Sequence, residues 1–304
     1  MRSFNRGNLL SRLSVAMIVI QSAACASAPA TSGVRPDWVD SSSARDSHWK
    51  RTEFVSAVGS GSTRSTAESA AKRAGADYVQ TPEMTNIMET NREKLFASLV
   101  EEDHDPTLAT LRELARSLSI YLHIGSLAVK VSPEKAANRS LLIDPYGEII
   151  ARYDKIHMFD VDLANGESYR ESRNFMPGET AVLADLPWGR LGLTVCYDLR
   201  FPALYRALAE AGASFLAIPA AFTQVTGEAH WHVLNRARAI ENTSYVIAAA
   251  QGGTHENGRA TYGHSIVVDP WGQIVAEGGQ EPGVIFAEID PAAVAAARAK
   301  IPSL

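Results

Sequence analysis

Cys196 is the residue with the clearest capacity for chemistry. An apolar run, Gly192–Val195, leads into it, and Pro202, a favoured first residue of a helix, follows closely. This order predicts a turn from a strand into a helix at the cysteine. We expect the positive potential of the helix N-terminus to lower the pKa of the thiol and favour a nucleophilic thiolate. A buried structural cysteine is the alternative.

Two charged residues complete a possible nucleophilic site. A thiol nucleophile needs a base and a group that stabilises the developing oxyanion. Glu83 follows the apolar segment Tyr78–Thr81, and Lys155 lies in the segment Tyr153–Asp160. Because both come just after a predicted strand, as Cys196 does, the three can meet at one rim of a sheet. In isolation, Glu83 could equally be an exposed loop acid and Lys155 a solvated surface charge.

Two histidines offer an alternative to Glu83 and Lys155 as the partner of Cys196. Cys196 could pair with His230 or His264, as in a Cys–His hydrolase. His230 is followed by Trp231, and such a pair is also typical of core packing or of a wall that contacts substrate. Replacement of each histidine would separate this reading from one that uses Lys155.

The elements around these residues form a duplicated α/β pattern. Residues 74–83 resemble residues 211–220, and residues 142–150 resemble residues 267–275. The second pair contains the sequences DPYG and DPWG between β-branched runs, which is typical of hairpin turns. The order helix, strand, helix, strand, hairpin occurs twice. This predicts an α/β fold with two pseudo-repeated halves, packed as an α-β-β-α sandwich.

Composition excludes several classes of protein. The chain has 304 residues, with 29 basic and 34 acidic side chains and a net charge of −5, whereas nucleic-acid binders usually present a basic face. Two cysteines, Cys25 and Cys196, rule out a disulfide framework. Zinc-type Cys/His spacings, HExxH and a P-loop are missing from the sequence. We therefore expect a small-molecule partner, with no metal, cofactor, nucleic acid or membrane partner.

The N-terminal segment differs from the rest. Residues 1–33 combine early arginines, the apolar run Leu13–Ile20 and small residues up to Ala28, which resembles a secretory signal. A buried strand with an unusual leader and an unstructured or corrupted extension are the other interpretations. The apolar run is too short to span a bilayer. We expect a cytoplasmic protein, although the signal-like N-terminus leaves export possible.

Five segments in order resemble the nitrilase superfamily of carbon–nitrogen hydrolases. They read TPEMTN (81–86), YDKIHMFD (153–160), GLTVCYDLRFPALYRAL (192–208), AFTQVTGEAHWHVLNRARAIEN (221–242) and RATYGHSIVVDPWG (259–272). The resemblance implies the nitrilase-type sandwich and the catalytic residues Glu83, Lys155 and Cys196. Cys196 would attack an amide, Glu83 would transfer protons, and Lys155 with the Tyr197 N–H would stabilise the oxyanion. A second glutamate of the family corresponds best to Glu171, with Glu167 as a competitor.

The branch that this chain resembles most contains deaminated-glutathione amidases and the related omega-amidases, which act on 2-oxoglutaramate. The first group cuts the α-keto analogue of glutathione into 2-oxoglutarate and cysteinylglycine. Both substrates carry an α-keto carboxylate, so the resemblance implies a nearby cation, for which Arg200 is the candidate. An ion pair of Arg200 with Asp198 or Glu241 is the alternative. His230 and Trp231 are expected at the substrate or just behind it, and a nitrile substrate is not favoured.

The family's first core strand has no clear counterpart here. Leu13–Ile20 is the more apolar candidate but lies far from Gly75, and Phe54–Val58 is nearer but weak. We favour Phe54–Val58, with residues 1–45 as a disordered or removed leader and residues 46–304 as the hydrolase domain. A frame shift upstream of about residue 65 is a further hypothesis. If the strand is missing, a non-catalytic scaffold is the alternative; otherwise we expect a homodimer or larger homo-oligomer.

Overall fold

Two six-stranded mixed sheets form the centre of the molecule in the computed structural model, which describes residues 13–19, 75–163 and 166–304. The first sheet has the order β16 (Gly283–Ile289), β1 (Leu13–Val19), β2 (Tyr78–Gln80), β3 (Tyr121–Lys130), β4 (Ala136–Ile143) and β5 (Ile149–Asp154). The second has the order β15 (Ile274–Glu277), β14 (Ile266–Val268), β11 (Tyr245–Ala248), β10 (Ala213–Ala217), β9 (Gly189–Leu193) and β8 (Val182–Leu186).

The two sheets have the same internal plan. In the first, β1, β2 and β3 are parallel, while β16, β4 and β5 complete the sheet with antiparallel pairings. In the second, β9, β10 and β11 are parallel, and β8, β14 and β15 take the antiparallel positions. Each strand therefore has a counterpart in the other half. The predicted duplication is confirmed at the level of strand order and direction.

The two hairpins predicted from DPYG and DPWG have matching turns. Asp144 Oδ1 accepts hydrogen bonds from the N–H groups of Tyr146 and Glu148, each at 2.9 Å. Asp269 Oδ1 accepts in the same way from Trp271 and Gln273, at 2.9 and 2.8 Å. The glycine that ends each turn has a positive φ, +80° at Gly147 and +83° at Gly272. A side chain would be strained there, which explains the shared glycine.

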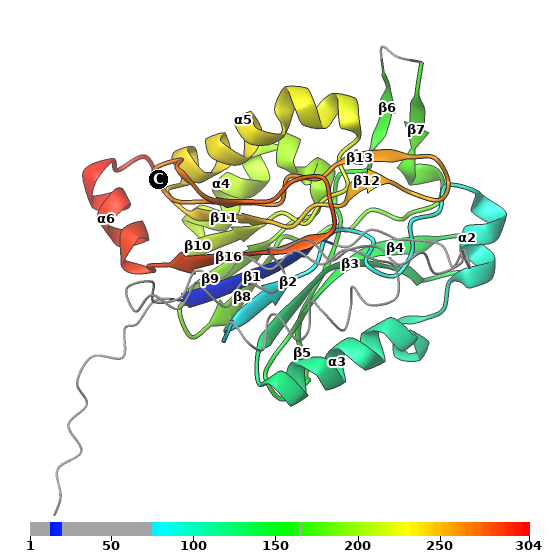
Figure 1. Ribbon diagram of the computed structural model, residues 1–304, viewed down its shortest axis with the longest axis horizontal. Helices are drawn as coiled ribbons and strands as arrows, with labels where there is room; N and C mark the ends of the chain where they lie inside the picture. Colours follow the sequence, from blue (N-terminus) through cyan, green and yellow to red (C-terminus); the bar gives the residue numbers. More distant parts are fainter. Residues whose placement is uncertain (1–12, 20–74, 164–165) are drawn as a thin grey trace, which may run out of the picture.

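Helices cover the outer faces of the two sheets, as Figure 1 shows. The first sheet carries α3 (Pro106–Leu118), and α2 (Arg92–Ser98) lies near its edge. The second sheet carries α4 (Pro202–Glu210) and α5 (Gln224–Asn242). The C-terminal helix is α6 (Ala292–Lys300). The 3₁₀ helices are η2 (Glu102–His104), η3 (Glu171–Arg173) and η4 (Cys196–Arg200). Two small hairpins consist of β6 (Asp160–Asp162) with β7 (Ser168–Arg170), and β12 (Gly252–Thr254) with β13 (Ala260–Tyr262). The predicted α-β-β-α sandwich is confirmed.

Local sequence explains where the main helices begin and which face they bury. Asp105 caps α3 by accepting the N–H groups of Thr107 and Leu108, and Pro106 takes the first helical position. Leu108, Leu111 and Ala115 then form one buried face against β3 and β4. None of the helices in the described part of the chain is long and apolar enough to cross a membrane.

A continuous core lies between the two sheets. Tyr78, Leu142 and Tyr153 of the first sheet belong to one buried cluster with residues of the second, such as Leu193 and Phe215. Polar links also cross this interface. Gln80 Nε2 donates to the carbonyl of Ile247 at 3.1 Å, and Gln251 Nε2 donates to the carbonyl of Glu83 at 3.0 Å. The two halves are therefore held in register next to Glu83.

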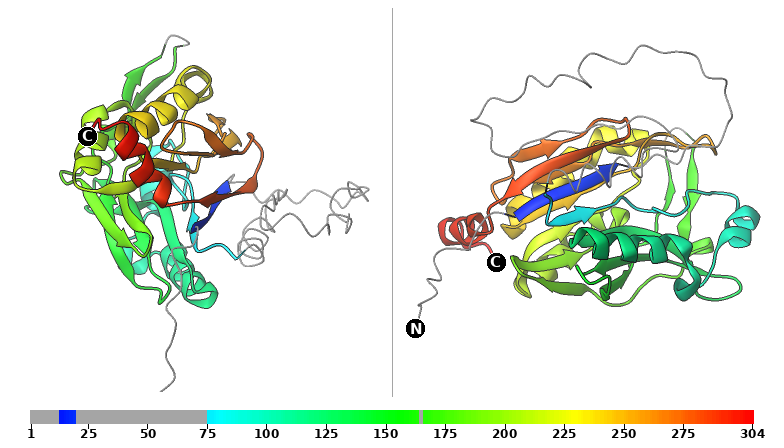
Figure 2. Two further views of the ribbon diagram at one scale, coloured as in Figure 1. Left: turned by 90° about the vertical axis from the view of Figure 1, so that its left-hand side faces the viewer. Right: turned by 60° about the horizontal axis from the view of Figure 1, so that its bottom comes forward.

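The choice of Phe54–Val58 as the first strand is wrong. Leu13–Val19 forms β1 and lies between β16 and β2, as both views of Figure 2 show. Loop length favoured the nearer segment, but the longer apolar run takes a central position with partners on both sides. Phe54–Val58 lies outside the described residues. The domain boundary at residue 46 stays a prediction, although β1 belongs to the hydrolase sheet.

A proline exchange tests the position of β1. Ala16 pairs with Phe286 of β16 and with Val79 of β2, and a proline has no N–H to donate in a central strand. We expect Ala16→Pro to lower the free energy of unfolding by on the order of 3 kcal/mol, measured by urea denaturation. Ala57→Pro, the comparison, introduces a proline into Phe54–Val58, the segment that the sequence predicted as the first strand. An equal or larger effect of Ala57→Pro would contradict the assignment of β1.

Candidate active site

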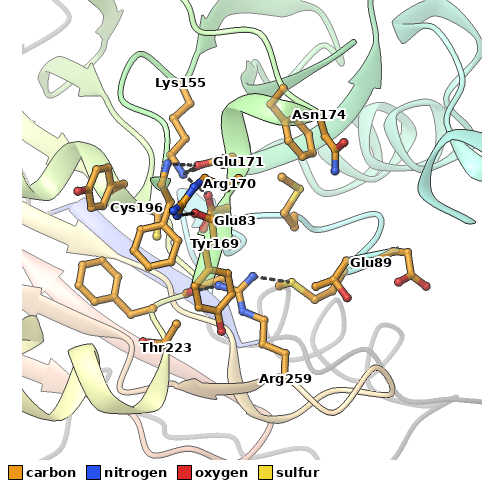
Figure 3. A pocket seen from close by; sticks show the side chains of 18 of the residues that line it. Glu83, Glu89, Lys155, Tyr169, Arg170, Glu171, Asn174, Cys196, Thr223 and Arg259 are labelled. Carbon is orange, nitrogen blue, oxygen red and sulfur yellow. Dashed lines mark hydrogen bonds and ion pairs between the residues drawn. The ribbon is translucent and has the colours of Figure 1, made fainter. Parts of the chain in front are cut away.

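Glu83, Lys155 and Cys196 lie together at one cavity of about 260 Å³ (Figure 3). Each follows the end of a strand: Glu83 follows β2, Lys155 follows β5 and Cys196 follows β9. β2 and β5 run in the same direction, so their C-terminal ends reach the same edge of the first sheet. The remaining walls include the mainly apolar side chains of Met84, Met88, Phe159, Tyr169, Phe175 and Phe222.

Glu83 is a buried carboxylate with an electrostatic bias towards the charged form. Its Oε1 accepts hydrogen bonds from Lys155 Nζ at 3.0 Å and from Asn138 Nδ2 at 2.9 Å. Burial alone would raise the pKa of Glu83, but the Lys155 charge and the hydrogen bonds from Cys196, Lys155 and Asn138 hold that pKa below the ordinary value of a glutamate. Glu83 is thus held as an ionised carboxylate next to the thiol.

Lys155 is a buried cation between two carboxylates. Its Nζ lies 3.0 Å from Glu83 Oε1 and 3.0 and 2.8 Å from the two carboxylate oxygens of Glu171. Burial alone would lower the pKa of Lys155, but the charges of Glu171 and Glu83 raise it above the ordinary lysine value. Lys155 therefore keeps its charge, and its side chain is only 2% exposed.

Glu171, at the start of η3, is the second glutamate of the site. Besides the two contacts with Lys155, its Oε2 accepts from the N–H of Phe159 at 2.7 Å. The competitor Glu167 instead accepts from the hydroxyl of Tyr169 in the exposed β7 region. The structure therefore places Glu171 rather than Glu167 beside the lysine.

Asn138, on β4, is a site residue that sequence reasoning missed. Its Nδ2 donates to Glu83 Oε1 at 2.9 Å and to Glu171 Oε1 at 3.0 Å, so one amide bridges the two carboxylates. Its Oδ1 is buried and has no hydrogen-bond partner among the described residues. The sequence does contain a signal for Asn138, because it is a single amide side chain that directly follows two alanines at the start of β4.

The backbone holds Cys196 in an uncommon conformation. Its φ is +48°, which is unusual for a residue other than glycine, and its N–H donates to the carbonyl of Pro219 at 2.9 Å. The strand β9 therefore turns sharply into η4 at the cysteine, which remains 7% exposed on the cavity side. The predicted elbow is present, and α4 begins at Pro202 as expected.

The predicted low pKa of the thiol is wrong. Burial raises the pKa of Cys196 well above the ordinary thiol value, and the charge of Glu83 raises it further, while Lys155 opposes both effects. The elbow opens into the short helix η4, and α4 starts six residues after Cys196, so the thiol is not in the first turn of α4, where a helix dipole has its main effect. The resting site holds a neutral thiol that donates a hydrogen bond to Glu83.

Asp198 joins the elbow of Cys196 to the loop that carries Lys155. Its Oδ2 accepts from Val195 N–H at 2.8 Å and from the Tyr153 hydroxyl at 2.7 Å. Its Oδ1 accepts from the backbone N–H of His157 at 3.1 Å, and His157 Nδ1 lies 2.7 Å away. The fully buried carboxylate thus ties the elbow of Cys196 to the loop of Lys155.

Arg200 and Tyr197 line the cavity, as expected for groups that contact a substrate. The guanidinium of Arg200 lies 5.3 Å from the centre of the Phe222 ring and 5.8 Å from that of Tyr197. The alternative ion pairs are not formed within the described part of the chain, because Asp198 binds Tyr153 and His157, and Glu241 pairs with Arg238. Arg200 therefore remains available to an anion.

His230 and Trp231 are not among the residues that line the cavity. His230 is exposed on α5, and its Nδ1 lies 3.3 Å from Arg200 Nη1. Trp231 is fully buried, packs against Phe222 with ring centres 5.0 Å apart, and donates its indole N–H to the carbonyl of His264. Neither His230 nor His264 lines the cavity that holds Cys196. The Cys–His alternative is therefore not supported by the geometry.

Arg259 is a further arginine of the cavity wall, which also contains Arg170 and Arg200, and sequence reasoning gave it no role in the site. It lies just before β13, and its Nη2 donates to the carbonyl of Ala221 at 2.7 Å. Its Nε is buried and has no hydrogen-bond partner among the described residues. The guanidinium also lies 5.4 Å from the centre of the Tyr169 ring. Arg259 thus lines the cavity close to Tyr169 (Figure 3).

Comparison with known proteins agrees with this geometry. Residues 25–299 match a family described as carbon-nitrogen hydrolase. The deaminated glutathione amidase of Yersinia enterocolitica is 47% identical over 217 residues, which are 70% of this chain and 74% of that protein. The crystal structure of the C. elegans NitFhit protein has a TM-score of 0.77 and 32% identity; the match covers 96% of this chain but only 64% of NitFhit.

A further solved structure bears on the cysteine. It is a mutant amidase from Nesterenkonia sp. AN1 in which the acetamide moiety of fluoroacetamide is covalently added at the active-site cysteine. It has 25% identity and a TM-score of 0.70, and the match covers 94% of each chain. The fold and the family matches together define an enzyme that hydrolyses the carbon–nitrogen bond of amides. The chain belongs to the carbon–nitrogen hydrolase family.

Removal of the Asn138 amide tests its effect on Glu83. Asn138→Ala deletes one donor to the carboxylate, so the pKa of Glu83 should rise. Because the base expected at this site is the ionised form of Glu83, we expect the acidic limb of the kcat/KM profile for an amide to move to higher pH. Ser140→Ala, a buried polar exchange two residues further along β4, is the control. A profile that does not move, or that moves equally in the control, would contradict the role.

Proposed function

We propose that this enzyme is a deaminated glutathione amidase that works through a cysteine thioester. The observation that carries the proposal is the buried set of Glu83, Lys155 and Glu171 beside Cys196, in a cavity that is also lined by three arginines. One of them, Arg170, pairs with Asp162, and the other two are Arg200 and Arg259. The relatives named deaminated glutathione amidase support the substrate, and the modified cysteine of the Nesterenkonia amidase supports the nucleophile.

The first half of the proposed reaction forms the thioester. The Sγ of Cys196 attacks the amide carbonyl carbon while its proton passes to Glu83. Protonation of Glu83 removes a negative charge from the side of Lys155 at the moment when the carbonyl oxygen becomes an oxyanion. The Lys155 N–H that pointed at Glu83 can then serve the oxyanion together with the Tyr197 N–H. The carbon–nitrogen bond breaks, and the proton on Glu83 moves to the leaving amine of cysteinylglycine.

The second half returns the enzyme to its starting state. Glu83, again a carboxylate, removes a proton from a water molecule that attacks the thioester carbonyl. The carbon–sulfur bond breaks, 2-oxoglutarate leaves, and Cys196 recovers its proton. The site therefore has the same net charge before and after one turnover. A neutral thiol at rest, next to an ionised base, fits this sequence better than a preformed thiolate.

Arg200 and Arg259 together favour deaminated glutathione over 2-oxoglutaramate as the substrate. Deaminated glutathione has a carboxylate at each end, whereas 2-oxoglutaramate has one. We assign Arg200, four residues after the nucleophile, to the α-keto carboxylate and Arg259 to the carboxylate of the leaving dipeptide. An omega-amidase would need only the first of these contacts. We also propose a cytoplasmic location, where thiols stay reduced, and a homodimer or larger homo-oligomer.

Loss of the thiol should abolish turnover. Cys196→Ala keeps the Cβ and so leaves the backbone conformation at φ +48° no more strained than before. We expect no release of 2-oxoglutarate from deaminated glutathione or from 2-oxoglutaramate, measured with a coupled dehydrogenase assay, and wild-type circular dichroism. Retained turnover would contradict the thioester mechanism. A wild-type enzyme that prefers 2-oxoglutaramate in kcat/KM would favour the omega-amidase alternative.

Arginine exchanges should separate the two ends of the substrate. Loss of one charged hydrogen-bond donor costs about 1.5–3 kcal/mol, or roughly 10–150-fold in kcat/KM. We expect Arg259→Gln to lose this factor for deaminated glutathione, mainly through KM, and to change little for 2-oxoglutaramate. Arg200→Gln should lose it for both substrates. Arg190→Gln, which breaks an exposed ion pair with Asp185, is the control. Equal losses for both substrates in Arg259→Gln would contradict the assignment.

A further inference from the structure

A second cluster of reactive side chains lies outside the cavity described above. His232 Nε2 lies 2.8 Å from Glu277 Oε1, and His264 Nδ1 lies 3.0 Å from the same oxygen. The three ligand atoms all lie within 4.8 Å of one another. Two imidazoles and one carboxylate are thus directed to one point on the surface of the second half.

Three separate elements bring these residues together. His232 is on α5, His264 lies between β13 and β14, and Glu277 ends β15. This separation explains why a search of the sequence for zinc-type spacings found nothing. The side chains are 30%, 26% and 33% exposed, respectively, so an ion can reach them from solvent. His232 and Glu277 lie on a helix and a strand, which hold ligands more rigidly than flexible loops do, while His264 lies on the short connection between two strands.

The backbone at His264 is strained in a way that serves this arrangement. Its φ is +56°, a conformation that costs energy for a residue other than glycine or asparagine. The ring stacks on Tyr262, with ring centres 4.4 Å apart, and its Nδ1 remains directed at Glu277. His232 approaches the same Tyr262 ring edge-on at 5.9 Å. Aromatic packing therefore orients both imidazoles before any ion is present.

We propose that His232, His264 and Glu277 form a binding site for a divalent transition-metal ion of the zinc type. Two histidines and one carboxylate are an established ligand set for zinc, with water in the remaining position. Ligand atoms around a tetrahedral zinc, with bonds of about 2.0–2.1 Å, lie ~3.3 Å apart. The contacts of 2.8 and 3.0 Å to Glu277 need only a small expansion to reach this spacing.

The site is connected to the wall of the catalytic cavity. The carbonyl of His264 accepts the indole N–H of Trp231 at 2.7 Å, and Trp231 packs against Phe222, which lines the cavity. Bound metal would hold His264 and α5 together and so stabilise this wall from behind. The expected consequence is higher stability of the loaded protein, because an ion that binds only the folded state stabilises it.

Calorimetric titration of the full-length protein with Zn²⁺, and absorption spectra with Co²⁺, test this proposal. We expect one saturable site, a tetrahedral cobalt spectrum without a thiolate charge-transfer band, and a higher Tm with Zn²⁺. His232→Ala, His264→Asn and Glu277→Gln should each weaken binding by at least about 100-fold, because loss of even an outer-shell partner costs 10–100-fold. Asparagine is chosen at residue 264 because it tolerates the positive φ.

His104→Ala, at an exposed histidine on η2, is the matched control and should leave the affinity unchanged. Circular dichroism of each variant establishes that it is folded. Binding that survives all three exchanges, that is lost equally in His104→Ala, or that shows a cobalt–thiolate band would overturn the proposal. So would the lack of a saturable site with a Kd below about 1 mM. None of these readouts depends on amidase activity, so the outcome is independent of the proposed function.

Discussion

The burial of the Lys155 ammonium group is the constraint on which the active-site region depends. Removing a charge from water is costly unless partners and hydrogen bonds compensate it. Lys155 meets this requirement through three contacts with Glu83 and Glu171, and Asn138 bridges the same two carboxylates. Burial raises the pKa of the neighbouring Cys196, and the charge of Glu83 raises it further against the opposing effect of Lys155. The same ion pairs therefore hold the segments after β2 and β5 and the start of η3 together, and they contribute to the electrostatics at Cys196.

Asp198, a second buried carboxylate, links the cluster around Lys155 to the other half of the molecule. Asp198 accepts hydrogen bonds from Val195, at the elbow, and from Tyr153 and His157, on either side of Lys155. Its side chain is fully buried, so each contact must stay formed for the charge to be tolerated. The contacts of Asp198 therefore fix the loop of Lys155 and the elbow of Cys196 relative to each other. The site works as one unit although its residues come from two sheets.

The parts of this architecture with short-range sequence signals were predictable. The strand ends before Glu83, Lys155 and Cys196, the DPYG and DPWG turns and the duplicated order all have such signals, and the structure contains them. The position of β1 was not predictable, because loop length and apolar content pointed to different segments. The protonation of Cys196 and the roles of Asn138 and Asp198 depend on contacts between distant segments, which spacing along the chain does not encode.

The duplication also explains why the molecule has this site at only one edge. In the repeated segments, Pro82 and Glu83 of the first half correspond to Pro219 and Ala220 of the second. The second half has an alanine at the position of the acid, and its proline carbonyl accepts the N–H of Cys196. The two loops meet at Gly125, where a Cβ would lie 2.4 Å from Pro219 Cβ and 2.1 Å from the carbonyl oxygen of Thr81. A side chain at residue 125 would push apart the loop of the base and the support of the nucleophile. The close approach of the two halves is therefore itself part of the catalytic geometry.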